Sequence, residues 1–359
     1  MRSHLHSHRF ARAAAAALAV AALAVAGVAP ALAAFPGQNG KILFDSERDG
    51  GDIDVWTMSP NGSNLVNLTA DSAASDLHAS WRADGRKIVF MSDRHTPRNP
   101  VPAGFPGPDF EIFVMNADGS NQTQITVNDR DDEVPAWSPS GKEIVFQRDF
   151  DPIRGSADDD IVTTDYDIVT MRADGTRERN LTKSPGVQEF DADWSADDRR
   201  IAFVSERDGD GEIYTMKPDG SRVRQLTFND GPFDGSPNWS PDGRKIAFDS
   251  DRDAVEETPF QVEIYTMEAD GDDQIRLTFD DLSDFVPAWS PDGRKITFSS
   301  FRNATEEIGF NSDIYLMRAD GSHLKQLTRD LAFDAGSDWQ PLNNHRGHHG
   351  HDEHHGDDD

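Results

Sequence analysis

Residues 239–248 read WSPDGRKIAF, and residues 289–298 read WSPDGRKITF, with a single substitution between the two copies. One copy alone is typical of a β-hairpin, because Ser-Pro-Asp-Gly has the chemistry of a type I turn followed by a left-handed glycine. Near-identical copies at a fixed spacing indicate more than a hairpin. They are typical of an array in which one supersecondary unit is repeated along the chain.

The rest of the chain falls into register with this stretch at a period of about fifty residues. An apolar run, a segment ending in methionine, an Asp-Gly or Asn-Gly turn and a closing Leu-Thr or Ile-Thr recur with it. The apolar runs are short, rich in β-branched and aromatic residues, and bounded by turn residues, which indicates four β-strands per unit. The repeat tryptophans are Trp81, Trp137, Trp194, Trp239, Trp289 and Trp339.

Four-stranded units at this period predict an all-β fold, a six-bladed β-propeller. The chain enters the first unit at its second strand, at residues 39–44, and residues 337–341 supply only the missing first strand. We therefore expect the N- and C-terminal strands to pair, which closes the ring and removes the open sheet edges. The predicted domains are the propeller at 35–342, a signal peptide at 1–34 and a disordered tail at 343–359.

Residues 1–34 have the layout of a secretory signal peptide. Three arginines precede an alanine-rich apolar run at 13–28, and Ala31-Leu32-Ala33 forms a small-x-small cleavage motif. The alternative, a membrane anchor, requires a longer and more apolar run. We therefore expect a secreted or periplasmic protein with no membrane span in its mature chain.

The composition restricts the class of partner. The 359 residues carry a formal net charge of −30 and contain no cysteine. A phosphate backbone would be repelled, which argues against nucleic acid, whereas cations and basic partners would be attracted. Without cysteine there is no disulfide framework, so the fold depends on its own core. We expect a monomer.

The stretch PAWSPDGRKITFSS at 287–300, followed by DIYLMRADGSHLKQLT at 313–328, resembles the repeat of TolB-type propellers, relatives of the WD-type repeats. The resemblance covers roughly residues 36–342. It implies an exported scaffold that binds a protein or peptide. TolB proteins carry a separate α/β domain before the propeller, and we expect none here because the propeller follows the predicted signal peptide directly.

Insertions gather on one face of the predicted ring. The connections between second and third strands share this face with the links between blades, and four of these connections are lengthened, at 95–110, 150–166, 254–262 and 303–312. Insertions confined to one face are typical of a binding face. Their apolar residues either contact a partner or pack the loops down: Phe105, Phe110, Phe150, Ile153, Phe260 and Phe310.

Charged residues repeat with the same period near the predicted channel mouth. An acid stands five residues before each repeat tryptophan: Asp76, Asp132, Glu189, Asp234, Asp284 and Asp334. An arginine follows each second strand: Arg48, Arg94, Arg148, Arg207, Arg252 and Arg302. Each hairpin brings its acid and arginine to the same end. The two open interpretations are a carboxylate ring that receives a cation or basic peptide, and six salt bridges that hold the blades; we favour the second.

A further set of acids starts the third strands and receives the same structural interpretation: Asp54, Glu111, Asp167, Glu212, Glu263 and Asp313. His78 breaks the symmetry near the channel mouth, because no other unit has a histidine there. It is either a functional group or an ordinary polar loop residue, and we favour the second.

Metal sites are predicted only as additions, and no cofactor is required. The acidic loop offers oxygen ligands of the kind that Ca²⁺ prefers, at Asp158, Asp159, Asp160, Asp165 and Asp167, although a solvated acidic loop is the favoured alternative. The tail offers imidazoles for zinc, nickel or copper at His345, His348, His349, His351, His354 and His355.

Three functions remain open at this point. The first is a binding scaffold that holds a protein or peptide on its looped face. The second is a polysaccharide lyase-like propeller enzyme, which requires a cluster of histidine ligands; the propeller sequence contains only His78, His95 and His323, and His323 follows a turn on the opposite face. The third is metal sequestration through the tail. We favour the first.

Overall fold

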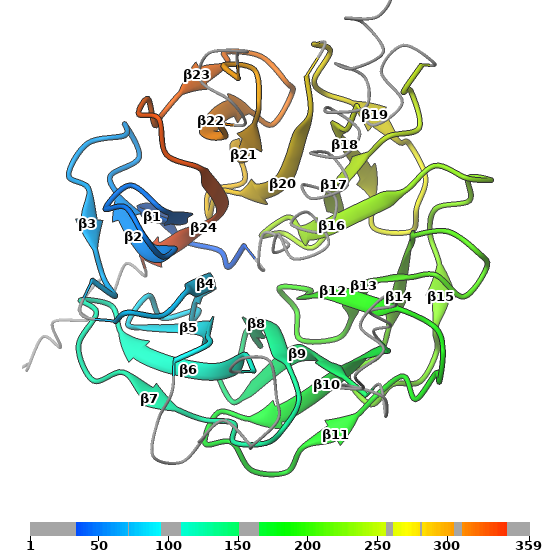
Figure 1. Cartoon of the computed structure of the whole chain (residues 1–359). Coiled ribbons are helices and arrows are strands. Elements are labelled where there is room, and N and C mark those ends of the chain that lie inside the picture. The colour runs from blue at the N-terminus through cyan, green and yellow to red at the C-terminus, as the bar shows by residue number, and fades with distance from the viewer. Residues whose placement is uncertain are drawn as a thin grey trace, which may run out of the picture.

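The computed structural model describes residues 34–70, 72–94, 109–150, 165–255, 261–280, 282–304 and 311–342. These residues form six antiparallel four-stranded sheets, arranged as blades around one axis (Figure 1). The predicted six-bladed β-propeller is therefore confirmed. The predicted signal peptide and tail lie outside the described residues, except that Ala34, the last residue assigned to the signal peptide, is buried in the fold.

The strands take equivalent places in every blade. The innermost strands are β4 (Asp76–Trp81), β8 (Asp132–Trp137), β12 (Glu189–Trp194), β16 (Asp234–Trp239), β20 (Asp284–Trp289) and β24 (Asp334–Leu342). The second strands are β1 (Gln38–Ser46), β5 (Lys87–Ser92), β9 (Glu143–Asp149), β13 (Ile201–Ser205), β17 (Lys245–Ser250) and β21 (Lys295–Ser300). The third strands are β2 (Asp54–Met58), β6 (Glu111–Asn116), β10 (Tyr166–Arg172), β14 (Glu212–Met216), β18 (Glu263–Glu268) and β22 (Asp313–Arg318). The outermost strands are β3 (Val66–Asn67), β7 (Thr123–Gln124), β11 (Arg179–Asn180), β15 (Arg224–Gln225), β19 (Ile275–Arg276) and β23 (Lys325–Gln326).

We number the blades by their innermost strands, so that β4–β7 form the first blade and the first unit of the repeat belongs to the sixth. This sixth, closing blade has the strand order β24-β1-β2-β3, so its innermost strand comes from the C-terminal end of the propeller. The register places Ile42 opposite Trp339 and Ser46 opposite Asp334. This pairing is the predicted closure of the ring. With this pair formed, each of the six innermost strands is hydrogen-bonded to the second strand of its own blade.

The turns that define the repeat have the expected backbone. Gly243 and Gly293 both have φ of 68°, the left-handed conformation that glycine adopts at little cost. In the fourth unit Asp198 takes the place of the glycine and has φ of 63°. Aspartate tolerates this region better than most residues, so the turn is preserved.

Each innermost strand contains a bulge two residues after its acid. The residues there have positive φ, among them His78 (55°), Val134 (53°) and Val286 (55°), and the pairing register shifts at the same point. Positive φ is rare for a β-branched residue. The bulge N–H donates to a side chain of the preceding blade at several junctions. Examples are His78 to Asp45 Oδ2 (3.0 Å), Asp191 to Gln147 Oε1 (3.2 Å), Val286 to Asp249 Oδ2 (2.8 Å) and Gly336 to Ser299 Oγ (3.1 Å). These bonds join neighbouring blades near the axis.

The core lies between the blades, where each repeat tryptophan packs against residues of the preceding blade. Trp339 shares a cluster with Phe285 and Ile314 of the fifth blade and with Phe44 of its own. Trp239 likewise packs against residues of the fourth and fifth units. Because every blade buries its apolar faces only against its neighbours, the closed ring is the unit that is stable.

The segment before β1 crosses the side of the ring that carries the tight turns. Ala34 and Phe35 are 1% and 2% exposed, and Gly37 N–H donates to Pro291 O (3.1 Å) in a turn of the fifth blade. Phe35 belongs to a cluster with Trp137, and Ala34 to one with Trp289. Figure 1 shows this segment running from β1 toward the centre of the ring.

Candidate functional site

The two faces of the ring differ in their connections. One side of the ring carries the connections from the second to the third strands and the links from each outermost strand to the next innermost strand. We call this side the looped face. The opposite, tight-turn face carries the Pro-Asp-Gly turns and the turns into the outermost strands. Both the repeated acids and the repeated arginines lie on the looped face, because all of them stand at these strand ends.

Each repeated acid of the innermost strands is paired with the arginine of its own blade. The N···O distances are 2.6 Å for Arg94–Asp76, 2.5 Å for Arg148–Asp132, 2.5 Å for Arg252–Asp234 and 2.7 Å for Arg48–Asp334. Arg207–Glu189 and Arg302–Asp284 are also paired. All six acids are fully buried. The arrangement gives each blade an internal ion pair rather than a ring of free carboxylates.

The acids of the third strands join each blade to its outermost strand. In the first unit Thr69 Oγ1 donates to Asp54 Oδ1 (2.8 Å) and accepts the Val55 N–H (3.0 Å). The Thr-to-backbone bond recurs in all six units, at 2.8–3.0 Å, through Thr69, Thr126, Thr182, Thr227, Thr278 and Thr328. The threonine of the Leu-Thr or Ile-Thr ending thus holds the two-residue outermost strand against the third strand of its blade.

The two sets of acids approach each other at the blade junctions, and burial raises their pKa values. Loss of hydration is the largest cause for Glu111, whose pKa rises to about 8 with a further contribution from the charge of Asp132. Burial also raises the pKa of Glu212 to about 7 and that of Asp284 to about 7. The pKa of Asp334 rises to about 6 for the same reason. These junctions retain protons that the unfolded chain would release.

We therefore expect stability to fall as pH rises. A carboxyl group whose pKa is raised on folding binds more protons in the folded state, so between about pH 4 and pH 8 unfolding becomes easier with each step in pH. The melting temperature at constant ionic strength should be higher near the lower limit of this window than near the upper one. Glu111→Gln should reduce this slope, whereas Asp118→Asn, at an exposed turn, should leave it unchanged. A melting temperature that rises with pH would contradict the assignment.

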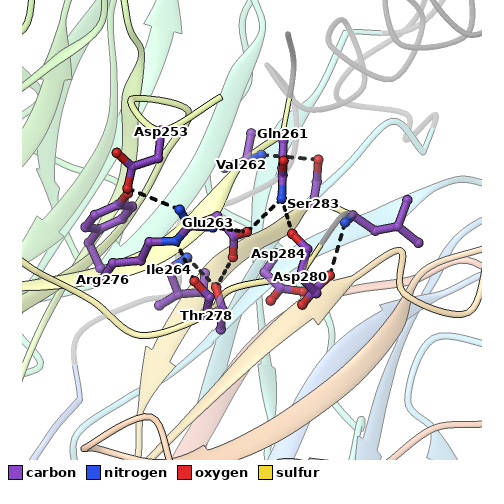
Figure 2. A network of polar contacts seen from close by, with 12 residues as sticks. Asp253, Gln261, Val262, Glu263, Ile264, Arg276, Thr278, Asp280, Ser283 and Asp284 are labelled. Atoms are coloured by element: carbon purple, nitrogen blue, oxygen red, sulfur yellow. Dashed lines mark hydrogen bonds and ion pairs between the residues drawn. The ribbon is translucent and has the colours of Figure 1, made fainter. Parts of the chain in front are cut away.

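The junction between the fifth and sixth units of the repeat carries an extended polar network (Figure 2). Arg276 lies between Asp253 and Glu263, at 3.2 and 2.6 Å. Arg302 contacts both Asp280 (2.5 Å) and Asp284. Thr278 and Gln261 donate to Glu263, at 2.5 and 3.0 Å.

This junction is also a possible cation ligand set. Oxygens of Glu263, Asp280 and Asp284 lie within 4.8 Å of one another, an oxygen donor set of the kind that hard divalent cations bind. Arg276 and Arg302 already contact all three carboxylates, however, and compensate most of their charge. We interpret the network as a set of ion pairs and hydrogen bonds that stabilises the junction between these two units.

Of the six apolar loop residues predicted for contact, Phe105, Ile153, Phe260 and Phe310 lie outside the described residues. Phe110 and Phe150 are half-buried and pack against the core cluster that contains Trp137. Arg130 lies over the Phe150 ring, 5.1 Å from its centroid. For these two residues the contacts correspond to the packing alternative.

Of the predicted histidines and acidic-loop residues, only some lie in the described part of the chain. His78 lies on β4 at the bulge, 4% exposed, rather than in a surface loop, and His323 lies exposed on the tight-turn face. These are the histidines of the described part of the chain, and they do not form a cluster. Asp165 accepts the Gly186 N–H (2.8 Å) and Asp167 accepts Thr182 Oγ1 (2.9 Å), whereas Asp158, Asp159 and Asp160 lie outside the described residues. The tail histidines also lie outside the described residues. The calcium site of the acidic loop and the transition-metal site of the tail therefore stay predictions.

Sequence reasoning missed the most exposed apolar side chains of the looped face. Leu331, Phe228 and Phe279 are 75%, 74% and 73% exposed, the largest values for large apolar residues in the described ranges. Phe228 and Phe279 directly follow the repeat threonines Thr227 and Thr278. The available signal was the symmetry break, since the residues at this place in the other units are Ala70, Val127, Lys183 and Arg329.

Six four-stranded blades closed into a ring define the fold as a six-bladed β-propeller. The family model described as the TolB beta propeller domain matches residues 161–254. This match agrees with the resemblance to TolB-type propellers that the repeat predicted.

Solved structures share the fold at low sequence identity. TolB from Acinetobacter baumannii superposes with a TM-score of 0.65 at 19% identity, over 86% of this chain and 68% of that one. The putative TolB from Agrobacterium tumefaciens gives 0.57 at 18% identity, over 85% and 99%. An oligogalacturonate lyase from Vibrio parahaemolyticus gives 0.53 at 12% identity, over 84% and 79%. Likeness at these identities establishes the fold alone.

The described part of the protein has no helix of the length and apolar character that crossing a bilayer demands.

Proposed function

We propose that this protein is an exported propeller scaffold that binds a protein or peptide partner through its looped face. The observation that carries the proposal is the outward placement of Phe228, Phe279 and Leu331, on links next to neighbouring blade junctions. Aromatic side chains are enriched in protein interfaces, because they bury a large area with few rotatable bonds. The TolB-like fold is consistent with such a scaffold.

The backbone around these anchors is fixed, which favours recognition over loop packing. Thr227 Oγ1 accepts the Ile213 N–H (2.9 Å) on one side of Phe228, and Asn229 N–H donates to Glu212 on the other. An anchor that is already held in place loses less conformational entropy when it is buried by a partner. The predicted signal peptide supports action outside the cytoplasm.

The test is capture of a partner by the full mature chain from an envelope or culture-supernatant extract, followed by reconstitution with the purified partner. Phe228→Ser combined with Phe279→Ser should weaken the reconstituted complex at least tenfold, since hot-spot residues contribute about 1.4 kcal/mol or more each. Val223→Ser combined with Leu324→Ser is the matched control, because both residues are 40–47% exposed on the tight-turn face. Loss of binding in the control pair alone would reject the looped face as the binding surface.

A further inference from the structure

We propose that the looped face binds a cationic segment of its partner, with apolar side chains of that segment seated on Phe228 and Phe279. This inference rests on the proposed function and names the chemistry of the partner. The surface concerned, called here the Phe228–Phe279 surface, consists of these two residues with Asp208, Asp230 and Asp253. It extends over the fourth and fifth units of the repeat, which form the third and fourth blades.

Acidic and aromatic residues alternate along this surface in the direction of the ring. Asp208 lies between β13 and β14, Phe228 and Asp230 on the link that follows β15, Asp253 between β17 and β18, and Phe279 on the link that follows β19. The three acids are exposed. Gln225 on β15 donates to Asp208, which ties the start of the series to the strand that precedes Phe228.

Arg276 joins the aromatic and acidic parts of the surface at its far end. Its guanidinium lies over the Phe279 ring, 4.9 Å from the centroid, and forms an ion pair with Asp253 at 3.2 Å. A cation is therefore already accommodated between this ring and this carboxylate. Around Phe228, a lysine or arginine side chain of a partner would find groups of the same kinds, an exposed aromatic ring with Asp208 and Asp230 on neighbouring connections.

Arg276 compensates Asp253, but the repeat arginines Arg252 and Arg302 do not neutralise the rest of this surface. Arg252 and Arg302 have side chains that are 16% exposed, and they are directed to the buried acids Asp234 and Asp284. The exposed acids thus add to a formal net charge of −30. Complementary charge gives a cationic partner faster association and greater specificity, whereas anionic membranes and nucleic acids are repelled.

The symmetry of the propeller separates this surface from the structural repeat. The position after the repeat threonine faces solvent in all six units, so no unit requires an aromatic residue there for packing. Only two successive units carry phenylalanine at this position, Phe228 and Phe279. A purely structural role would be expected to recur in every blade.

The test uses the full mature chain and two fluorescently labelled synthetic peptides with identical aromatic positions, one with lysine and one with glutamate at all other positions. By fluorescence anisotropy at low salt, the lysine peptide should bind at least tenfold more tightly than the glutamate peptide. Raising the salt concentration should weaken binding of the lysine peptide. Phe228→Ala with Phe279→Ala should raise its Kd about tenfold, and Asp208→Asn with Asp230→Asn and Asp253→Asn should raise it as well.

The control Val223→Ala with Leu324→Ala should leave the Kd unchanged. Equal binding of both peptides would overturn the inference, because the charge of the segment would then play no part. Equal loss in the control and the phenylalanine variants would also overturn it, since binding would then not depend on the Phe228–Phe279 surface. A captured partner that needs Phe228 and Phe279 but presents no basic segment would also overturn it while leaving the proposed function intact. A partner insensitive to both phenylalanines would instead reject the proposed function.

Discussion

Replacing Trp339 with alanine is expected to lower the free energy of unfolding by about 3–5 kcal/mol, the range measured for large aromatic residues removed from a core. Trp339 is 1% exposed and lies between the fifth blade and the closing blade. Its indole Nε1 donates to Thr297 Oγ1 (3.0 Å) of the fifth blade, so the substitution removes an inter-blade hydrogen bond together with the packing. Urea denaturation followed by intrinsic fluorescence and circular dichroism would measure the loss.

Leu342→Ala provides the matched control for this experiment. Leu342 lies on the same strand, β24, but is 42% exposed, so its truncation should cost no more than about 0.5 kcal/mol. If both variants cost the same, the effect would reflect fraying of β24 rather than packing at the junction.

The second large effect is expected for the ion pair of the closing blade. Arg48→Met should cost about 3–5 kcal/mol, because it leaves the fully buried Asp334 carboxylate without its cation. The guanidinium also lies 4.9 Å and 5.0 Å from the ring centroids of Phe44 and Trp56, contacts that methionine replaces only in part. Chemical denaturation at neutral pH is the appropriate measurement.

A double variant separates the ion pair from the packing. Arg48→Met combined with Asp334→Asn should be more stable than Arg48→Met alone, since the uncompensated charge is then absent. Arg244→Met, at an arginine whose side chain is 82% exposed, should change stability by less than about 0.5 kcal/mol. A double variant less stable than the single one would show that Asp334 is held by other contacts.

Much of this architecture follows from the sequence because the same local rules act in each unit. The Pro-Asp-Gly turn, the short apolar runs and the half-units at both ends predict the blades, their order and the closing pair of strands. The proximity of acid and arginine also follows, since a hairpin returns both to the same end. These features depend on turn chemistry and alternation, which are readable along a single strand.

Features that depend on neighbouring blades were not predictable in this way. Val286 adopts positive φ at a bulge whose N–H is held by Asp249 of the preceding blade, and no property of valine indicates this conformation. His78 is buried at the equivalent bulge of β4. The role of the repeat threonines was visible only once their strand partners were placed. The exposure of Phe228 and Phe279 required knowledge that the position after the threonine faces solvent.

The closing blade has a mechanical consequence. Gln38 and Leu342 are paired at one end of β1 and β24, and Ser46 and Asp334 at the other. If the protein were pulled by attachments at Gln38 and Leu342, the load would fall on this pair first. The two strands would then separate one residue pair at a time. Such unzipping ends at the ion pair between Arg48 and Asp334. The ring would therefore open at a defined seam, with the other five blades still joined as one arc.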